Sequence, residues 1–283
     1  TINIGQDTRT PVLTIGNATV DEEGLPVRGS EPAGSAAAGD SEIFTGSFTV
    51  NTQGENLTAL TIGSGTYNLV SGGSQTLIND PQGTLVVTGV TGPSGGPFSV
   101  NYTYTLKDNV LTHSVQGDDD TVNGPLFVVS ATDATGDVGT GNLQVVISDD
   151  APTANNDADS AVEGVFTPVT GNVITGLGTT GGAGGAGADV KGADDAAVSQ
   201  VVGFNGSTDS NPSGGFTVTG QYGNLTMGPD GEYSYTLTAA SVPVGATDVF
   251  TYTLKDGDND TDPATLTINI GQDTRTPVLT IGN

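Results

Sequence analysis

Four carboxylates alternate in the stretch LKDGDNDTDPATLTINI, residues 254–270, where Asp256, Asp258, Asp260 and Asp262 occupy every second position between two runs typical of β-strands. Oxygen ligands at this density suit a hard cation such as Ca²⁺, which takes about six to eight of them from carboxylates, carbonyl groups and water. A plain solvated turn is the alternative, because Asp and Gly favour hairpin turns for backbone reasons alone. Asp262 precedes a proline and is expected only to flank the site.

The charge of the chain supports a cationic partner. Its 283 residues carry 32 acidic and 6 basic side chains, for a formal net charge of −26. This excess argues against nucleic acid or an anionic membrane as partner, since both are bound through Lys and Arg. Self-repulsion of this size destabilises a compact state unless something cationic neutralises it. Outside cells a divalent ion is the simplest neutraliser. The sequence has no Cys, which excludes disulfides and thiolate metal sites.

The two ends of the chain are identical. TINIGQDTRTPVLTIGN occupies residues 1–17 and recurs unchanged at 267–283, a period of 266 residues. The identity predicts one period of a tandem array in which each copy does the same physical job. Prolines interrupt strand ladders and mark the expected junctions at Pro11, Pro152 and Pro277. The predicted parts are residues 1–10 from a preceding copy, one domain over 11–150, another over 151–276, and the start of a following copy at 277–283.

Both domains show the alternation of half-buried antiparallel strands. Val, Leu, Ile, Phe and Tyr alternate with Thr, Ser and Asn, and this period-two pattern favours folded β-structure over disorder. The segments are GSFTVNT, LTALTIG, TLVVTGV, FSVNYTYTL, PLFVVSAT and GNLQVVIS, then VSQVVGFN, GGFTVTGQ, GNLTMG, EYSYTLT, DVFTYTLKD and ATLTINI. Asp230-Gly231 predicts a hairpin. The expected fold is all-β, with tandem immunoglobulin-like or cadherin-like sandwiches of seven strands in an elongated arrangement.

Several of these motifs carry a family resemblance. TANNDADSAVEG, GNVI, GQYGNLTMGPDGEYSYTL and DVFTYTLKDGDNDTDPATLTI resemble the VCBS-type repeats of very large bacterial adhesins. VDEEGLP, GSFTVN, SATDATGD and VVISDDAP resemble the longer Ig-like repeat of giant proteins exported by type I secretion. Together the resemblance covers nearly the whole chain. It implies an extender repeat of a Lap-type RTX biofilm adhesin, a calcium-stiffened stalk on the bacterial surface.

An Ig topology sorts the acidic residues into two poles of each domain. The BC, DE and FG loops gather with the incoming chain, and the AB, CD and EF turns gather with the outgoing chain. Acidic segments from consecutive domains are therefore expected to converge on each linker, where they supply a calcium cage. The candidate metal ligands are Asp7, Asp21, Glu22, Asp133, Asp137, Asp149, Asp150, Asp157, Glu163, Asp256, Asp258, Asp260 and Asp273. Weaker candidates are Glu23, Asp118, Asp119, Asp120 and Asp248.

Other motifs fit their known templates poorly. DGDNDTDPATLT has Thr261 and Thr267 where an EF-hand loop needs Gly and Glu. GGAGAD, residues 184–189, is a single RTX-like nonapeptide start that cannot stack, and Gly182, Gly184 and Gly187 match GxGxxG without a strand before them or a helix after them. A flexible surface loop is expected there.

Catalysis has few candidate residues in this sequence. His113 is the one histidine and is expected on a strand surface, which leaves a Ser-His-Asp arrangement without support. A glycosidase-type carboxylate pair stays open, although the chain has no Trp for sugar stacking. We therefore expect no enzymatic activity.

The leading hypothesis is a monomeric extracellular spacer whose partners are calcium and neighbouring repeats of the same chain, without membrane insertion. Two alternatives belong to other classes. One is a carbohydrate- or protein-binding module that uses loops 176–197 or 205–215. The other is homotypic adhesion between chains on neighbouring cells.

Overall fold

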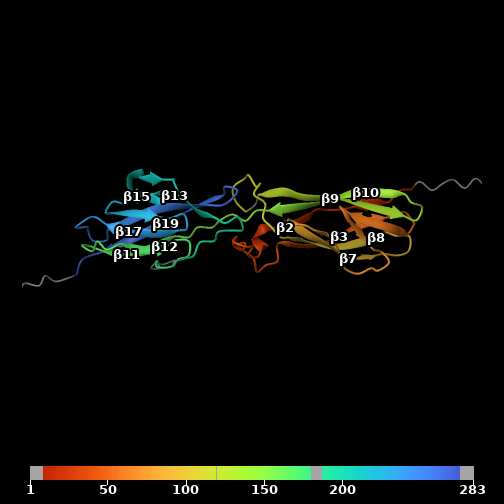
Figure 1. Cartoon of the computed structure of the whole chain (residues 1–283), viewed down its shortest axis with the longest axis horizontal. Helices are drawn as coiled ribbons and strands as arrows, with labels where there is room; N and C mark the ends of the chain where they lie inside the picture. The colour runs from red at the N-terminus through yellow and green to blue at the C-terminus, as the bar shows by residue number, and fades with distance from the viewer. Residues whose placement is uncertain (1–8, 119, 180–186, 275–283) are drawn as a thin grey trace, which may run out of the picture. The chain divides into compact units, whose positions relative to one another are not determined.

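The structure of the protein is a computed structural model that describes residues 9–118, 120–179 and 187–274. The chain divides into two compact units, Thr1–Asp150 and Ala151–Asn283, called the first and second unit below (Figure 1). Regular structure in the described residues is all β apart from two 3₁₀ turns, which confirms the predicted fold class. No helix among these residues is long and apolar enough to cross a membrane. The candidates Asp7 and Asp119 and the predicted segment 277–283 lie outside the described residues.

The first unit contains two five-stranded sheets. One has the order β1-β3-β8-β7-β6 and the other the order β2-β10-β9-β4-β5, with β2 parallel to β10 and the remaining pairs antiparallel. The elements are β1 (Val12–Thr14), β2 (Ala18–Asp21), η1 (Glu22–Gly24), β3 (Ile43–Asn51), β4 (Leu57–Ile62), β5 (Gly65–Tyr67), β6 (Gln75–Asn79), β7 (Gly83–Thr91), β8 (Phe98–Leu106), β9 (Thr121–Asp133) and β10 (Val138–Ser148).

The second unit repeats this plan with one strand fewer among the described residues. Its sheets have the orders β11-β19-β18-β13-β14 and β12-β17-β16-β15, and β11 runs parallel to β19. The elements are β11 (Asp157–Val162), β12 (Val169–Asn172), β13 (Ala197–Val202), η2 (Phe204–Gly206), β14 (Thr208–Asp209), β15 (Phe216–Thr219), β16 (Gly223–Met227), β17 (Glu232–Leu237), β18 (Thr247–Lys255) and β19 (Thr261–Gly271).

Both units are sandwiches because alternate side chains of the two sheets pack face to face. In the first unit the rings of Tyr104 on β8 and Phe127 on β9 lie 6.2 Å apart and join the sheets. In the second unit Tyr235 on β17 and Phe250 on β18 make the equivalent contact at 6.0 Å. Each predicted strand segment falls on an observed strand. The extra strands beyond the expected seven, such as β1, β5 and β14, are short edge pairings with weak alternation.

The predicted hairpin at Asp230-Gly231 joins β16 to β17. Gly231 has φ +80° there, a left-handed conformation that glycine adopts without the steric cost of a Cβ. Within each unit the loops cluster as an Ig topology requires. The end with the β3–β4, β7–β8 and β9–β10 loops, and its counterpart in the second unit, is called the N-terminal pole below. The opposite end of each unit is its C-terminal pole.

Candidate metal-binding turns

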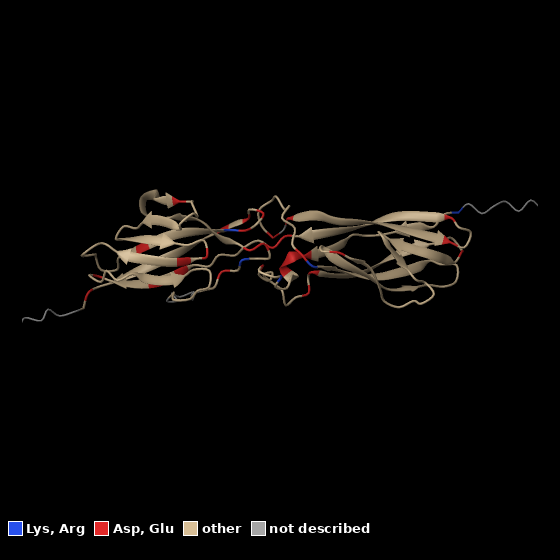
Figure 2. Cartoon of the chain, in the orientation of Figure 1, with Lys and Arg blue, Asp and Glu red and all other residues tan. Residues whose placement is uncertain are grey.

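Most Asp and Glu positions lie in loops and at strand ends of each unit (Figure 2). At the N-terminal pole of the first unit, the β9–β10 turn runs from Asp133 to Asp137. The Asp133 amide donates to the Asp137 carbonyl oxygen (3.1 Å), and the Asp137 amide donates back to Asp133 Oδ1 (3.0 Å). Gly136, the fourth residue, has φ +91°. The first carboxylate thus closes its own turn.

The β18–β19 turn of the second unit, Asp256 to Asp260, has the same construction. The Asp256 amide donates to the Asp260 carbonyl oxygen (3.1 Å), and the amides of Asn259 and Asp260 donate to Asp256 Oδ1 (3.0 and 2.7 Å). The fourth residue, Asn259, has φ +93°, which Asn tolerates better than most side chains do. The two units therefore repeat one turn with different sequences, DATGD and DGDND.

The first carboxylate of each turn keeps one oxygen for a further ligand. Asp133 Oδ2 and Asp256 Oδ2 are buried and accept no hydrogen bond from the described residues, and the two side chains are 1% and 7% exposed. A buried carboxylate oxygen without a donor costs free energy that a cation would recover. Hard oxygen donors are also the set that Ca²⁺ prefers. The residues present thus fit calcium.

Glu55 joins the turn of the first unit and was not predicted. The Thr135 hydroxyl oxygen lies 2.9 Å from Asp133 Oδ1, 3.0 Å from Glu55 Oε2 and 3.4 Å from Asp137 Oδ2. A hydroxyl has one proton, so it cannot serve three carboxylates at once. Glu55 lies in the β3–β4 loop, and its position next to the β9–β10 turn could have been inferred from the Ig topology.

Charge is denser in the turn of the second unit. Asp258 and Asp260 are 9% and 4% exposed. Burial and the neighbouring carboxyl groups of Asp258 and Asp260 raise the pKa of Asp256 to about 7, against its ordinary 3.8, although the Asp260 amide acts in the opposite direction. Asp262 is not part of this turn. Its Oδ2 accepts the amide of Ala154 at 2.7 Å, which is the flanking position expected from the sequence.

Two more buried carboxylates come from the long loop between β12 and β13. Asp189 is 8% and Asp194 5% exposed, and the Gly257 amide donates to the Asp194 carbonyl oxygen at 3.1 Å. Asp189 ends the GGAGAD stretch, so the prediction of a flexible surface loop is wrong for this residue. Its amide donates to Ile174 O at 2.9 Å, a packing contact that glycine content does not reveal. Asp157, a predicted ligand, is buried at the start of β11.

At the C-terminal pole of the first unit, the predicted acidic residues do come together. Asp21 caps the 3₁₀ turn η1 by accepting the Glu23 amide at 2.9 Å. Its pKa is raised mainly by burial, and then by the negative charges of Asp150 and Asp118, although the Glu23 amide acts in the opposite direction. Asp150 Oδ2 accepts the Ser35 amide at 2.9 Å. Asp118 is exposed.

Asp120, a weaker candidate, serves the backbone of its own loop. It accepts the amides of Ser114, Val115 and Thr121, at 2.7, 2.8 and 2.8 Å. The first two of these amides contribute most to lowering the pKa of Asp120 below its ordinary value. Its carboxylate thus acts as a structural acceptor in the β8–β9 loop.

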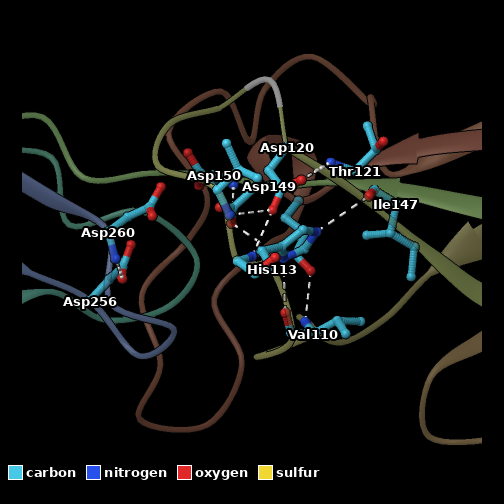
Figure 3. A network of polar contacts seen from close by, with 12 residues as sticks. Val110, His113, Asp120, Thr121, Ile147, Asp149, Asp150, Asp256 and Asp260 are labelled. Carbon is cyan, nitrogen blue, oxygen red and sulfur yellow. Dashed lines mark hydrogen bonds and ion pairs between the residues drawn. The ribbon is translucent and has the colours of Figure 1, made fainter.

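His113 lies inside this pole, so the prediction of a strand-surface histidine is wrong. It belongs to the β8–β9 loop and is 5% exposed. Figure 3 shows its ring between two backbone carbonyls, with Nδ1 3.0 Å from Val110 O and Nε2 3.3 Å from Ile147 O. Nδ1 is also 3.5 Å from Asp149 Oδ1. Both ring nitrogens thus face backbone carbonyl oxygens, and the Asp149 carboxylate lies beside the ring.

Glu22 completes this buried group. Ligand atoms of Glu22, His113 and Asp149 all lie within 4.8 Å of one another. Glu22 Oε1 accepts the Val110 amide at 2.7 Å. The sequence predicted Glu22 and Asp149 as calcium ligands, but the structure places a histidine between them. A nitrogen donor does not belong to the oxygen set that calcium prefers.

The C-terminal pole of the second unit brings Glu163 and Asp273 together. Glu163 accepts the amides of Val242 (3.1 Å) and Asp273 (3.4 Å). The Ser241 hydroxyl and these amides lower the pKa of Glu163. Asp273 is exposed.

Asp248, a weaker candidate for the same pole, lies in the interior, and both of its carboxylate oxygens accept hydrogen bonds. It is 2% exposed. Its carboxylate accepts the Tyr235 hydroxyl and the Gln221 amide, both at 2.7 Å, and also the Tyr222 amide. Donors to both oxygens leave this side chain as a structural acceptor of the sandwich.

No protein-family model and no curated protein matches the sequence. Among solved structures, the chain is similar to extracellular cadherin domains 1–4 of protocadherin gamma B7, at 10% identity over 93% of this chain and 51% of that chain, TM-score 0.27. Domains 1–3 of mouse protocadherin gamma C3 match at 12% identity over 93% and 68%, TM-score 0.27. The N-terminal Ig1-2 module of the Drosophila receptor tyrosine phosphatase DLAR matches at 10% identity over 94% and 100%, TM-score 0.23. The chain spans about half the length of the first of these.

Proposed function

We propose that the chain is a calcium-stiffened structural spacer of a bacterial cell-surface adhesin, which projects adhesive domains from the cell for surface attachment and biofilm formation. Tandem sandwiches supply a repeated, non-catalytic building block. The net charge of −26 makes the folded chain dependent on cations. The sequence resemblance to extender repeats supports the bacterial and extracellular setting.

One observation carries the calcium assignment. The same five-residue turn occurs at the same topological position in both units, and in each its first Asp keeps a buried oxygen without a donor. A turn kept for its backbone shape alone would not need an oxygen withheld from hydrogen bonding. Repetition in units of different sequence argues for a shared ligand.

Calcium bound at these turns would supply positive charge to carboxylates that now repel one another. Asp133 and Asp256 are already oriented by the turn amides, so little ordering is needed when an ion binds. Extracellular modules bind calcium with dissociation constants of about 10⁻⁴ to 10⁻³ M, so a site of this class fills outside cells and empties in the cytosol. The bound ion then holds the turn in one conformation and stiffens the spacer.

Thermal unfolding of the full chain in calcium and in chelator tests the proposal. At free calcium about 100 times the dissociation constant, each filled site contributes about 2.7 kcal/mol. Asp256→Asn keeps the turn acceptor but removes one of the three negative charges of the turn, and we expect it to lose most of the calcium-dependent stabilisation of the second unit. Asp209→Asn is the matched control, since the Asp209 carboxylate accepts the backbone amides of Asn211 and Thr217 and lies outside the turn.

Small-angle scattering provides the second readout. The spacer proposal predicts that the profile of the full chain differs between calcium and chelator, and that the Asp256→Asn variant narrows this difference. An identical profile and an identical melting curve in both conditions would contradict it.

A ligand-binding module is the second candidate, because a surface hollow of about 1010 Å³ lies on the sheet that contains β12 and β17. Its rim includes Leu177, Gly178 and Gly214, from the two loops that the sequence suggested. The one aromatic residue of its lining, Tyr233, is 4% exposed, so no ring face is available for sugar stacking. A glycan-array signal that Gly178→Trp abolishes would favour this candidate over the spacer.

A further inference from the structure

Asp157 and Asp189 meet inside the second unit although 32 residues separate them in the sequence. Asp157 begins β11, and Asp189 lies in the loop between β12 and β13. The loop is fastened to the segment before β11 by backbone hydrogen bonds between Thr153 and Val190 in both directions, each 2.9 Å. The Asn155 amide donates to Asp189 Oδ1 at 2.7 Å. Two chain segments thus position two carboxylates.

Both carboxylates point to the hydroxyl of Tyr252. This oxygen lies 2.7 Å from Asn155 O, 3.3 Å from Asp157 Oδ2, and 3.1 Å from each oxygen of Asp189. A phenol has one proton, so it can satisfy only one of these four acceptors well. The Asn155 carbonyl oxygen is nearest. Several oxygens therefore converge without enough donors, which is the arrangement that a hard cation requires.

A further oxygen is withheld from hydrogen bonding. Asp157 Oδ1 is buried and accepts no hydrogen bond from the described residues. The nearby Thr179 hydroxyl donates to Gly176 O at 2.9 Å. Asp157, Asp189 and Tyr252 are 3%, 8% and 0% exposed, so water gives them little stabilisation.

The charge of this pocket is not balanced by basic side chains. In the described part of the chain, no Lys or Arg forms an ion pair with Asp157 or Asp189. Burial raises the pKa of Asp157 to about 6 and that of Asp189 to about 7, and the charges of Asp157 and Asp262 add to the effect at Asp189.

We propose that Asp157, Asp189 and the Asn155 carbonyl oxygen form a second divalent-cation site in the second unit, with the Tyr252 hydroxyl as a neutral neighbour and calcium as the expected ion. The site is carried by the β12–β13 loop and is distinct from the Asp256 to Asp260 turn. It deepens the proposed spacer function and rests on it, because the bound ion ties the long loop to the sandwich.

Counting bound calcium ions by equilibrium dialysis of the full chain tests this site. Asp189→Asn removes one charge but keeps an oxygen for the Asn155 amide, and Asp157→Asn removes one charge but keeps an oxygen for the Tyr252 hydroxyl. Each variant is expected to bind one ion fewer than the wild type. Asp195→Asn is the matched control in the same loop. Asp195 is exposed, pairs with Lys191, and has φ +57°, which Asn accommodates. The control should bind as many ions as the wild type.

Terbium luminescence gives a readout at the site itself. The chain contains no Trp, so tyrosine alone can sensitise a bound Tb³⁺ ion, and Tyr252 lies against this site. We expect the sensitised emission to drop in Asp189→Asn, Asp157→Asn and Tyr252→Phe, and to persist in Asp195→Asn. Circular dichroism in chelator establishes that each variant keeps the β-fold. Asp157→Asn provides the test if Asp189→Asn fails to fold.

The outcomes separate this site from the proposed function. If Asp189→Asn and Asp157→Asn bind as many ions as the wild type while Asp256→Asn binds fewer, the second site is disproved and the spacer proposal stands. In that case, a proton shared between the two carboxyl groups explains why both are buried at this place. If the wild type binds no calcium, both proposals fail.

Discussion

The turns DATGD and DGDND share one backbone conformation but differ in the number of carboxylates that they contain. In both, the first Asp accepts the amide of the fifth residue, and the fourth residue has a φ close to +90°. They differ at the third position, where Thr135 donates a hydroxyl proton and Asp258 adds a carboxylate. The first carboxylate therefore sets the shape of the turn, and we expect the third residue to set its demand for a cation.

The two units also differ in how buried acids are compensated. The first unit places His113 beside Asp149 and Glu22 at its C-terminal pole. The second unit buries Asp157, Asp189 and Asp256 without an ion pair to Lys or Arg in the described residues. We therefore expect the buried acids of the second unit to respond more strongly to a cation from solution.

Removing His113 is expected to have the largest effect. His113→Asn removes a buried ring whose nitrogens face the Val110 and Ile147 carbonyl oxygens, and each buried polar group left unsatisfied costs about 1–3 kcal/mol. Amide hydrogen exchange, followed separately for β8–β10 and β17–β19, should show the loss in the first unit alone. The double variant His113→Asn/Asp149→Asn is the control, because it separates the carbonyl contacts of the ring from its proximity to the Asp149 carboxylate. Equal stability of His113→Asn and wild type would show that the buried ring does not stabilise the first unit.

Raising the pH is expected to destabilise the metal-free second unit. The pKa values of Asp157, Asp189 and Asp256 are raised by burial from 3.8 to about 6, 7 and 7, so the folded state binds more protons than the unfolded state between these values. Their contribution is fully present below pH 3.8 and is lost as the pH rises through about 7. Urea midpoints in chelator should fall across this window.

Calcium should flatten this pH profile at its alkaline end, because it binds the ionised carboxylates. The double variant Asp157→Asn/Asp189→Asn should show a smaller decrease of the urea midpoint with pH in chelator. An unchanged slope in that variant would assign the pH dependence to the net charge of the chain instead.

Exchanging the third residues of the two turns should give each turn the calcium response of the other. Asp258→Thr is expected to stabilise the second unit in chelator, on the order of 1 kcal/mol, and to weaken its response to calcium. Thr135→Asp should do the reverse in the first unit. Calcium titrations of both melting curves check the exchange. If both substitutions shift calcium affinity in the same direction, the third position does not set the demand for a cation.

The smallest effect is expected at Glu55. Glu55→Gln keeps an acceptor for Thr135 but removes one of three carboxylates around its hydroxyl. Because Glu55 is partly exposed, the substitution should raise the free energy of unfolding in chelator by a few tenths of a kcal/mol. In calcium the substitution should lower the free energy of unfolding instead, because a ligand charge is lost. The sign change between chelator and calcium is therefore the decisive measurement. Glu31→Gln, which neutralises an exposed carboxylate that pairs with the largely buried Arg28, provides a charge-matched control.

Strand positions were predictable because alternation is a property of neighbouring residues. The segments FSVNYTYTL and DVFTYTLKD lie on β8 and β18 as expected. The turns were predictable too, because the Asp256 carboxylate finds its donors within four residues. Glu55, Asp189 and His113 could not be placed in this way. Their partners lie 80 residues away for Glu55, 63 for Asp189 and 34 for His113.

The sequence by itself determined the all-β fold, the strands, the hairpin at Asp230-Gly231 and the turns that carry candidate ligands, since each depends on contacts between near neighbours. Only the tertiary structure decided which carboxylates are buried together and which lie beside a histidine. Burial and ion pairing depend on loops that the sheets bring side by side. A loop sequence rich in Gly and Asp does not indicate which strands will pack against the loop.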